Sequence, residues 1–171
     1  MTEGAQRKSW WKSAVLAVVA IEAAGGLSGW LSNSGYGNVW FDTLAKPSFM
    51  PPGWIFGLVW PILYALLGIA VAMIAAEPSS ERRRLGLTLF VVQLALNLAW
   101  SPIFFAAHSI AIAKWLVFII AIVAAAAAGQ FYRVRKPAGL LMIPYLAWLV
   151  FAAALSASIE ALNGGANRLL V

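Results

Sequence analysis

Five long apolar segments constrain the fold of this 171-residue chain more than any other feature. The segments cover about 14–32, 54–76, 85–107, 110–132 and 139–162, and each is close to the roughly 20 residues that a helix needs to cross the hydrocarbon core of a bilayer. Lipid offers no hydrogen-bonding partner to backbone groups, and the segments lack the period-2 alternation of strands. We therefore predict an all-α fold, in which residues 1–171 form a single membrane domain of five transmembrane helices.

The composition agrees with this fold and excludes several classes of function. Hydrophobic residues make up 63% of the chain and charged residues only 11%, which is typical of an integral, multi-pass membrane protein. The chain has no cysteine, so disulfides, thiolate catalysis and cysteine-ligated zinc are excluded. A single histidine, His108, is too few for a bis-histidine haem site or a zinc site. We expect no bound metal, and a solvated His108 in a short loop.

The distribution of basic residues predicts the orientation of the helices. The side that holds the amino terminus carries Arg7, Lys8, Lys12, Arg82, Arg83, Arg84, Arg133, Arg135 and Lys136, whereas the other side carries Lys46, Lys114 and Arg168. By the positive-inside rule, we expect a cytoplasmic amino terminus, in a bacterial membrane. Because the basic clusters lie between apolar runs, they indicate topology and a lipid bilayer as partner, and we predict no nucleic-acid partner.

Residues 33–53 form a long connection between the first two predicted helices. The connection contains Trp40, Lys46 and Pro47, and two further prolines precede the next helix. Proline fixes φ and favours an ordered segment, and long ordered connections are often lids over binding sites. Trp40 and Trp54 also fit the aromatic belt of a membrane interface. The residues alone therefore leave a lid and an interfacial elbow as alternatives.

Three of the predicted helices place aromatic and amide side chains on shared faces. These are Trp60 and Tyr64 in the second helix, Asn97 and Phe104 in the third, and Tyr145, Trp148 and Ala152 in the fifth. Such faces are common in packed cores, and membrane amides also form interhelical hydrogen bonds worth about 0.6–2 kcal/mol. The pattern fits both core packing and a slot for a flat ligand.

Three motifs in this chain resemble those of the TspO/MBR family of tryptophan-rich sensory proteins and translocator proteins, also called peripheral-type benzodiazepine receptors. The motifs run from Trp40 to Tyr64, from Gln93 to Phe105 with Trp100 in the pattern, and from Pro144 to Ala152. The resemblance implies five transmembrane helices with a cavity that loop 33–53 covers. One departure is Ser156, which stands where relatives usually have asparagine.

The resemblance also implies a class of ligand. The expected ligand is a tetrapyrrole, protoporphyrin IX or haem, without an obligatory cofactor, and its flat π-system would stack on aromatic side chains. Sterols, isoquinoline carboxamide-type ligands and a homodimer are implied as well. The implied ligand-binding residues are Trp40, Lys46, Pro47, Trp54, Trp60, Tyr64, Asn97, Trp100, Phe104, Tyr145, Trp148 and Ala152.

Several activities remain open for such a protein, namely sensing, trafficking or degrading porphyrin. In some relatives, cavity tryptophans take part in light- and oxygen-dependent porphyrin breakdown, for which Trp54 and Trp148 are the candidates here. Glu22 is the other unusual residue, because an ionised carboxylate near the middle of a membrane helix costs about 2.5–3.5 kcal/mol. It is either a protonated packing residue or the coupling group of a proton-coupled transporter of a hydrophobic small molecule.

Overall fold

The computed structural model describes residues 3–164, with side chains from residue 10 onward. This part of the chain is helical and contains no strand. Five of its stretches are long and apolar enough to cross a membrane: Trp10–Leu31, Gly53–Ala75, Glu81–Ala106, Ile110–Val134 and Lys136–Asn163. The prediction of an all-α protein with five membrane-spanning helices is confirmed.

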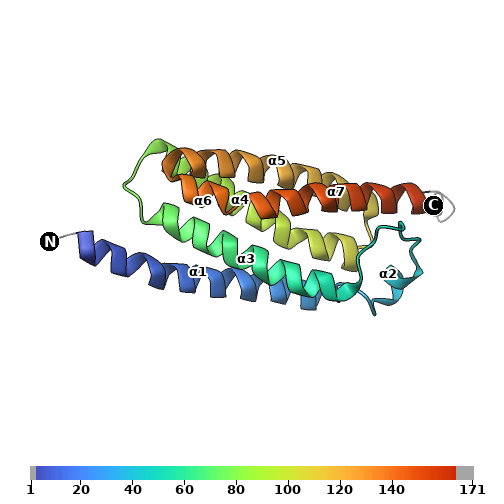
Figure 1. Ribbon diagram of the computed structural model, residues 1–171. Helices are drawn as coiled ribbons and strands as arrows, with labels where there is room; N and C mark the ends of the chain where they lie inside the picture. The colour runs from blue at the N-terminus through green and yellow to red at the C-terminus, as the bar shows by residue number, and fades with distance from the viewer. Residues whose placement is uncertain (1–2, 165–171) are drawn as a thin grey trace.

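The helices lie side by side in one elongated bundle, as Figure 1 shows. In chain order they are α1 (Glu3–Leu31), α2 (Val39–Thr43), α3 (Gly53–Ala75), α4 (Glu81–Ser101), η1 (Pro102–Ala106), α5 (Ile110–Val134), α6 (Lys136–Leu140) and α7 (Ile143–Asn163). The α3–α4 and α5–α6 connections lie at the same end as the start of α1, whereas α2 and the end of α7 lie at the opposite end (Figure 1). The most extensive packing joins α4 to α5, α1 to α3 and α5 to α7.

Two glycines allow α1 and α3 to approach closely. A Cβ on Gly68 of α3 would lie 2.7 Å from the backbone nitrogen of Val18, and a Cβ on Gly25 of α1 would lie 2.1 Å from Cε2 of Tyr64. Neither distance is possible between real atoms, so each position requires glycine at this helix separation. The tight contact places α1 as one wall of the bundle interior.

Prolines shape the ends of two helices beyond what the apolar pattern predicts. The span predicted at 139–162 is divided, because α6 ends at Leu140 and α7 starts at Ile143, with Pro144 in the first turn where its missing N–H is not needed. The third span ends in a π-helical turn, η1, in which the N–H of Ala107 donates to the carbonyl of Pro102 at 2.8 Å. Helix α4 also begins earlier than the predicted 85, because Ser80 caps it.

Pro102 leaves an acceptor that another helix satisfies. Since proline has no N–H, the carbonyl of Leu98 loses its donor within α4. The hydroxyl of Ser28 in α1 donates to this oxygen at 2.6 Å. In a bilayer, where no water can replace the missing donor, this hydrogen bond fixes α1 to α4 beside the interior of the bundle.

Candidate functional site: an aromatic cavity in the bundle

A cavity of about 670 Å³ lies among the helices of the bundle, at the end where the loop around α2 borders it. Its walls come from α1, α3, α4, η1, α5 and α7, and the loop around α2 contributes Tyr36, Phe41 and Met50. Helices α3 and α7 make few contacts with one another, so they leave room between them. The loop therefore forms part of the cavity wall.

Seven of the twelve residues proposed from the sequence line this cavity. They are Trp60 and Tyr64 from α3, Asn97 and Trp100 from α4, Phe104 from η1, and Trp148 and Ala152 from α7. Because α3, the continuous α4–η1 segment and α7 are distant from one another in sequence, only the folded bundle brings these residues together.

Aromatic rings of the cavity wall contact one another both between helices and within one helical segment. Phe56 of α3 packs edge-on against Trp148 of α7, with ring centroids 5.7 Å apart. Trp100 and Phe104 stack at 4.9 Å with an interplanar angle of 8°, and the Trp100 indole N–H donates to the carbonyl of Ala113 at 3.0 Å. The N–H groups of Trp60 and Trp148 have no such partner within residues 10–164. Both of these tryptophans line the cavity.

Five of the proposed residues lie outside the cavity lining. Trp54 is 68% exposed at the start of α3, and Pro47 lies in the loop. Trp40 instead stacks on the exposed His108, with ring centroids 4.3 Å apart. Of the two tryptophans suggested for oxidative chemistry, only Trp148 therefore lines the cavity.

Lys46 holds the loop together. Its ammonium group donates to the carbonyls of Phe41 at 2.8 Å, Leu44 at 3.2 Å and Asp42 at 3.3 Å, and lies 4.6 Å from the centre of the Phe41 ring. With its donors used in this way, the side chain fixes the turn after α2 and does not line the cavity. Phe41, which does line it, is positioned through this contact.

Two tyrosine–amide pairs form a polar layer among the helices. Tyr64 donates to Oδ1 of Asn97 at 2.8 Å, and Tyr145 donates to Oε1 of Gln93 at 2.7 Å. Tyr145 and Gln93 are fully buried outside the cavity, and the Gln93 amide nitrogen has no hydrogen-bond partner among the side chains and backbone that the structure describes. The interhelical role considered for these amides is therefore present in the structure, and Asn97 combines it with a place in the cavity wall.

The cavity is also lined by residues that the sequence pattern did not place in a binding site. Glu22, Gly25, Gly26 and Gly29 form one face of α1 along the cavity, at spacings of three and four residues. Ser156, at the position where relatives usually have asparagine, also lines the cavity. The small side chains on α1 could have indicated a hollow face, but small residues are equally common where helices pack closely.

The fold and the cavity define a class: a multi-pass membrane protein with five membrane-spanning helices and a cavity lined by aromatic side chains. The chain belongs to the TspO/MBR family, whose model matches residues 15–162. It is 42% identical over 135 residues to the translocator protein of Sus scrofa, covering 76% of this chain and 80% of the relative. It is 39% identical over 131 residues to the tryptophan-rich protein TspO of Chlorobaculum tepidum, covering 72% and 79%. The protein CrtK of Rhodobacter capsulatus is 36% identical over 127 residues, covering 74% and 79%.

Proposed function

We propose that this protein binds a tetrapyrrole, protoporphyrin IX or haem, in the cavity of the bundle. The observation that carries the proposal is the size and lining of the cavity. Its volume of about 670 Å³ lies within the range of about 300–1,000 Å³ that is usual for small-molecule sites. Rings from α3, α4, η1 and α7 surround the space, and a large flat π-system gains from contacts with such rings.

The proposed pose follows from the polarity of the walls. The macrocycle lies among the aromatic rings, between Trp148 on one side and Trp100 on the other. Its carboxylates point toward the loop, where water at the membrane surface solvates them. Lys46 contributes indirectly, because its ammonium is already bound to three carbonyls of the loop that it holds in place.

The test compares Trp148, which lines the cavity, with Trp54, which lies outside it. Protoporphyrin IX is titrated into purified protein in detergent micelles, and binding is followed by the Soret band and by quenching of tryptophan fluorescence. Trp148→Ala removes a ring that lines the cavity, so we expect affinity to fall at least about tenfold, the loss of about 1.4 kcal/mol. Trp54→Ala removes an exposed ring outside it and should bind like wild type. Absence of saturable binding by wild type, or equal loss in both variants, would contradict the proposal.

A second candidate function is proton-coupled transport of a hydrophobic small molecule, and the position of Glu22 favours it. This carboxyl group lines the cavity in the apolar part of α1, where ionisable residues commonly mark transport or proton sites. In proteoliposomes with an imposed pH gradient, Glu22→Gln should abolish gradient-driven uptake while equilibrium binding persists. Uptake that is unchanged in Glu22→Gln would remove this candidate.

A further inference from the structure

We propose that the cavity also accepts a second class of ligand, an aromatic molecule that carries a protonated amine, and that the Glu22 carboxylate binds the amine. This proposal depends on the cavity and not on tetrapyrrole binding. It follows from three features of the wall: the place of Glu22, its lack of a partner, and the absence of a basic residue.

Glycines leave the Glu22 carboxyl group accessible from the cavity. Gly25, Gly26 and Gly29 follow Glu22 at i+3, i+4 and i+7, and all four line the cavity. A Cβ placed on Gly26 would meet nothing within 4 Å. No side chain on this face of α1 therefore stands between the carboxyl group and a guest.

Within residues 10–164, no side chain or backbone group forms a hydrogen bond or an ion pair with the Glu22 carboxyl group. Its neighbour across the helix contact is Tyr64, whose ring packs against Gly25 one turn further along α1. The single hydroxyl hydrogen of Tyr64 is donated to Asn97 at 2.8 Å and is not available to a carboxylate. An acceptor is thus left facing the cavity at the depth of the membrane core.

The charge and rings of the wall favour a cation. Glu22 is the only charged residue among the described residues that line the cavity, and no lysine or arginine is among them. A cation facing several aromatic rings is attracted by their negative faces, and the lining supplies Trp60, Trp100 and Trp148. One carboxylate within an aromatic cavity suits an organic ammonium ion better than an anion.

Helix α3 adds a backbone acceptor to the same wall. Pro61 has no N–H, so the carbonyl of Gly57 lacks its usual donor in the helix. Gly57 and Pro61 both line the cavity. An ammonium group with more than one N–H could therefore find a second acceptor on α3, the helix that packs directly against α1.

The test uses a matched pair of flat probes that differ in charge. The cation 9-aminoacridine and the neutral hydrocarbon anthracene are titrated into the full-length protein in the same micelles. Wild type should bind the cation more tightly. Glu22→Gln keeps the shape but removes the charge, so affinity for 9-aminoacridine should fall about tenfold or more while that for anthracene stays within about twofold.

Glu81→Gln is the control, because Glu81 is an exposed carboxylate in the first turn of α4, outside the cavity, and its loss changes the net charge equally. An equal effect of Glu81→Gln, or an equal loss for both probes in Glu22→Gln, would overturn the proposal.

If Glu22→Gln does not fold, a competition experiment on wild type decides. N-methylacridinium, which is permanently charged, should then displace bound 9-aminoacridine better than anthracene does, and the opposite order would overturn the proposal. Protoporphyrin is titrated in parallel. Amine binding without porphyrin binding would remove the tetrapyrrole proposal alone, and the reverse result would remove this one.

Discussion

At Gly25 a missing side chain sets the distance between two membrane helices. A Cβ there would lie 2.1 Å from the ring of Tyr64. Because this tyrosine is buried and hydrogen-bonded to Asn97, its ring cannot move aside easily. We expect Gly25→Ala to lower the free energy of unfolding by about 1–3 kcal/mol, the usual cost of overpacking. Gly26→Ala is the matched control, since its Cβ would meet nothing within 4 Å. Thermal unfolding in micelles should separate the two, and equal midpoints would disprove this account of the contact.

Ser28 is a second single residue that stabilises the packing of α1, in this case through a hydrogen bond to α4. Its hydroxyl satisfies the Leu98 carbonyl that Pro102 leaves without a donor. We expect Ser28→Ala to destabilise the fold by about 0.6–2 kcal/mol, the usual range for such bonds in membranes. Ser158→Ala should have little effect, because that exposed hydroxyl bonds the Ala154 carbonyl of its own helix. A Ser28→Ala variant as stable as Ser158→Ala would show that another group satisfies Leu98.

At the scale of the elements, the side chain of Asn163 links the segment around α2 to the end of α7 by hydrogen bonds. Asn163 accepts from the N–H of Ala45 and donates to its carbonyl, both at 2.9 Å. The segment also supplies part of the cavity wall, so its opening should control the escape of a ligand. We expect Asn163→Ala to raise the dissociation rate of bound protoporphyrin several-fold, and to speed amide exchange at Ala45. Ser158→Ala on the same helix is the control, and unchanged rates in Asn163→Ala would show that the packing of Phe49 against Phe151 of α7 is enough to keep the segment in place.

The sequence predicted the helices well and their irregularities less well. Five apolar runs of membrane length leave little choice of fold, because unsatisfied backbone groups are not tolerated in lipid. The π-helical turn at Pro102 and the break before Ile143 do not appear in the apolar pattern, because each follows from local backbone hydrogen bonds around a proline and not from hydropathy. Helical spacing likewise grouped Trp148 and Ala152 on one face, but it gave no sign that Trp54 would point away from the cavity while Glu22 lined it.

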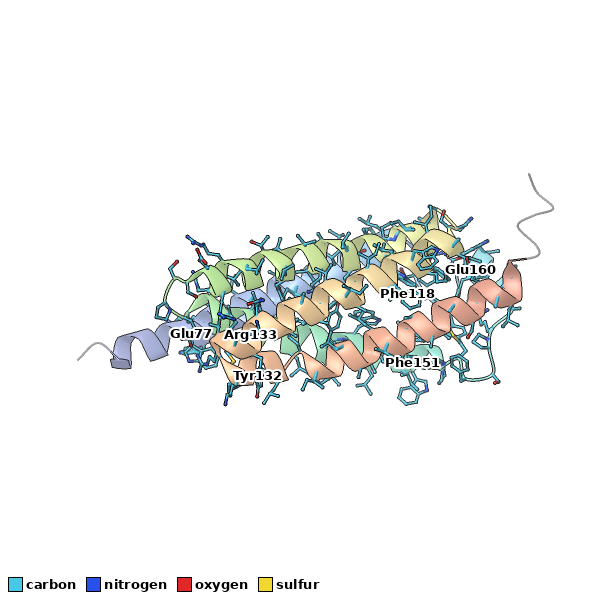
Figure 2. All side chains as sticks on the ribbon, turned by 90° about the horizontal axis from the view of Figure 1, so that it is seen from above. Glu77, Phe118, Tyr132, Arg133, Phe151 and Glu160 are labelled. Carbon is cyan, nitrogen blue, oxygen red and sulfur yellow. The ribbon has the colours of Figure 1, made fainter. Side chains whose placement is uncertain are left out.

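For the whole molecule, the two ends of the bundle differ in how many basic side chains are left without a partner. At the end with α2, Lys46 is bound to backbone carbonyls and Lys114 is paired with Glu160. At the opposite end, where Figure 2 shows Glu77, Tyr132 and Arg133, two arginines are engaged: Arg83 caps the end of α3 and Arg135 pairs with Glu77. Within residues 10–164, exposed cations without such partners remain at this end, namely Arg82, Arg84, Arg133 and Lys136. By the positive-inside rule, this end should face the cytoplasm.

The absence of cysteine from the chain allows a direct test of that orientation. Ser79→Cys places one thiol in the α3–α4 connection and Ser48→Cys places one in the loop after α2, and both positions are exposed. In intact cells, or in spheroplasts if an outer membrane blocks access, a membrane-impermeant maleimide should label Ser48→Cys and leave Ser79→Cys unlabelled. After lysis both should react, which shows that each thiol is accessible. The reverse pattern would place α2 and the loop beside the cavity in the cytoplasm. The cavity would then open toward the interior of the cell, since Tyr36 and Met50 of that segment form its wall at this end.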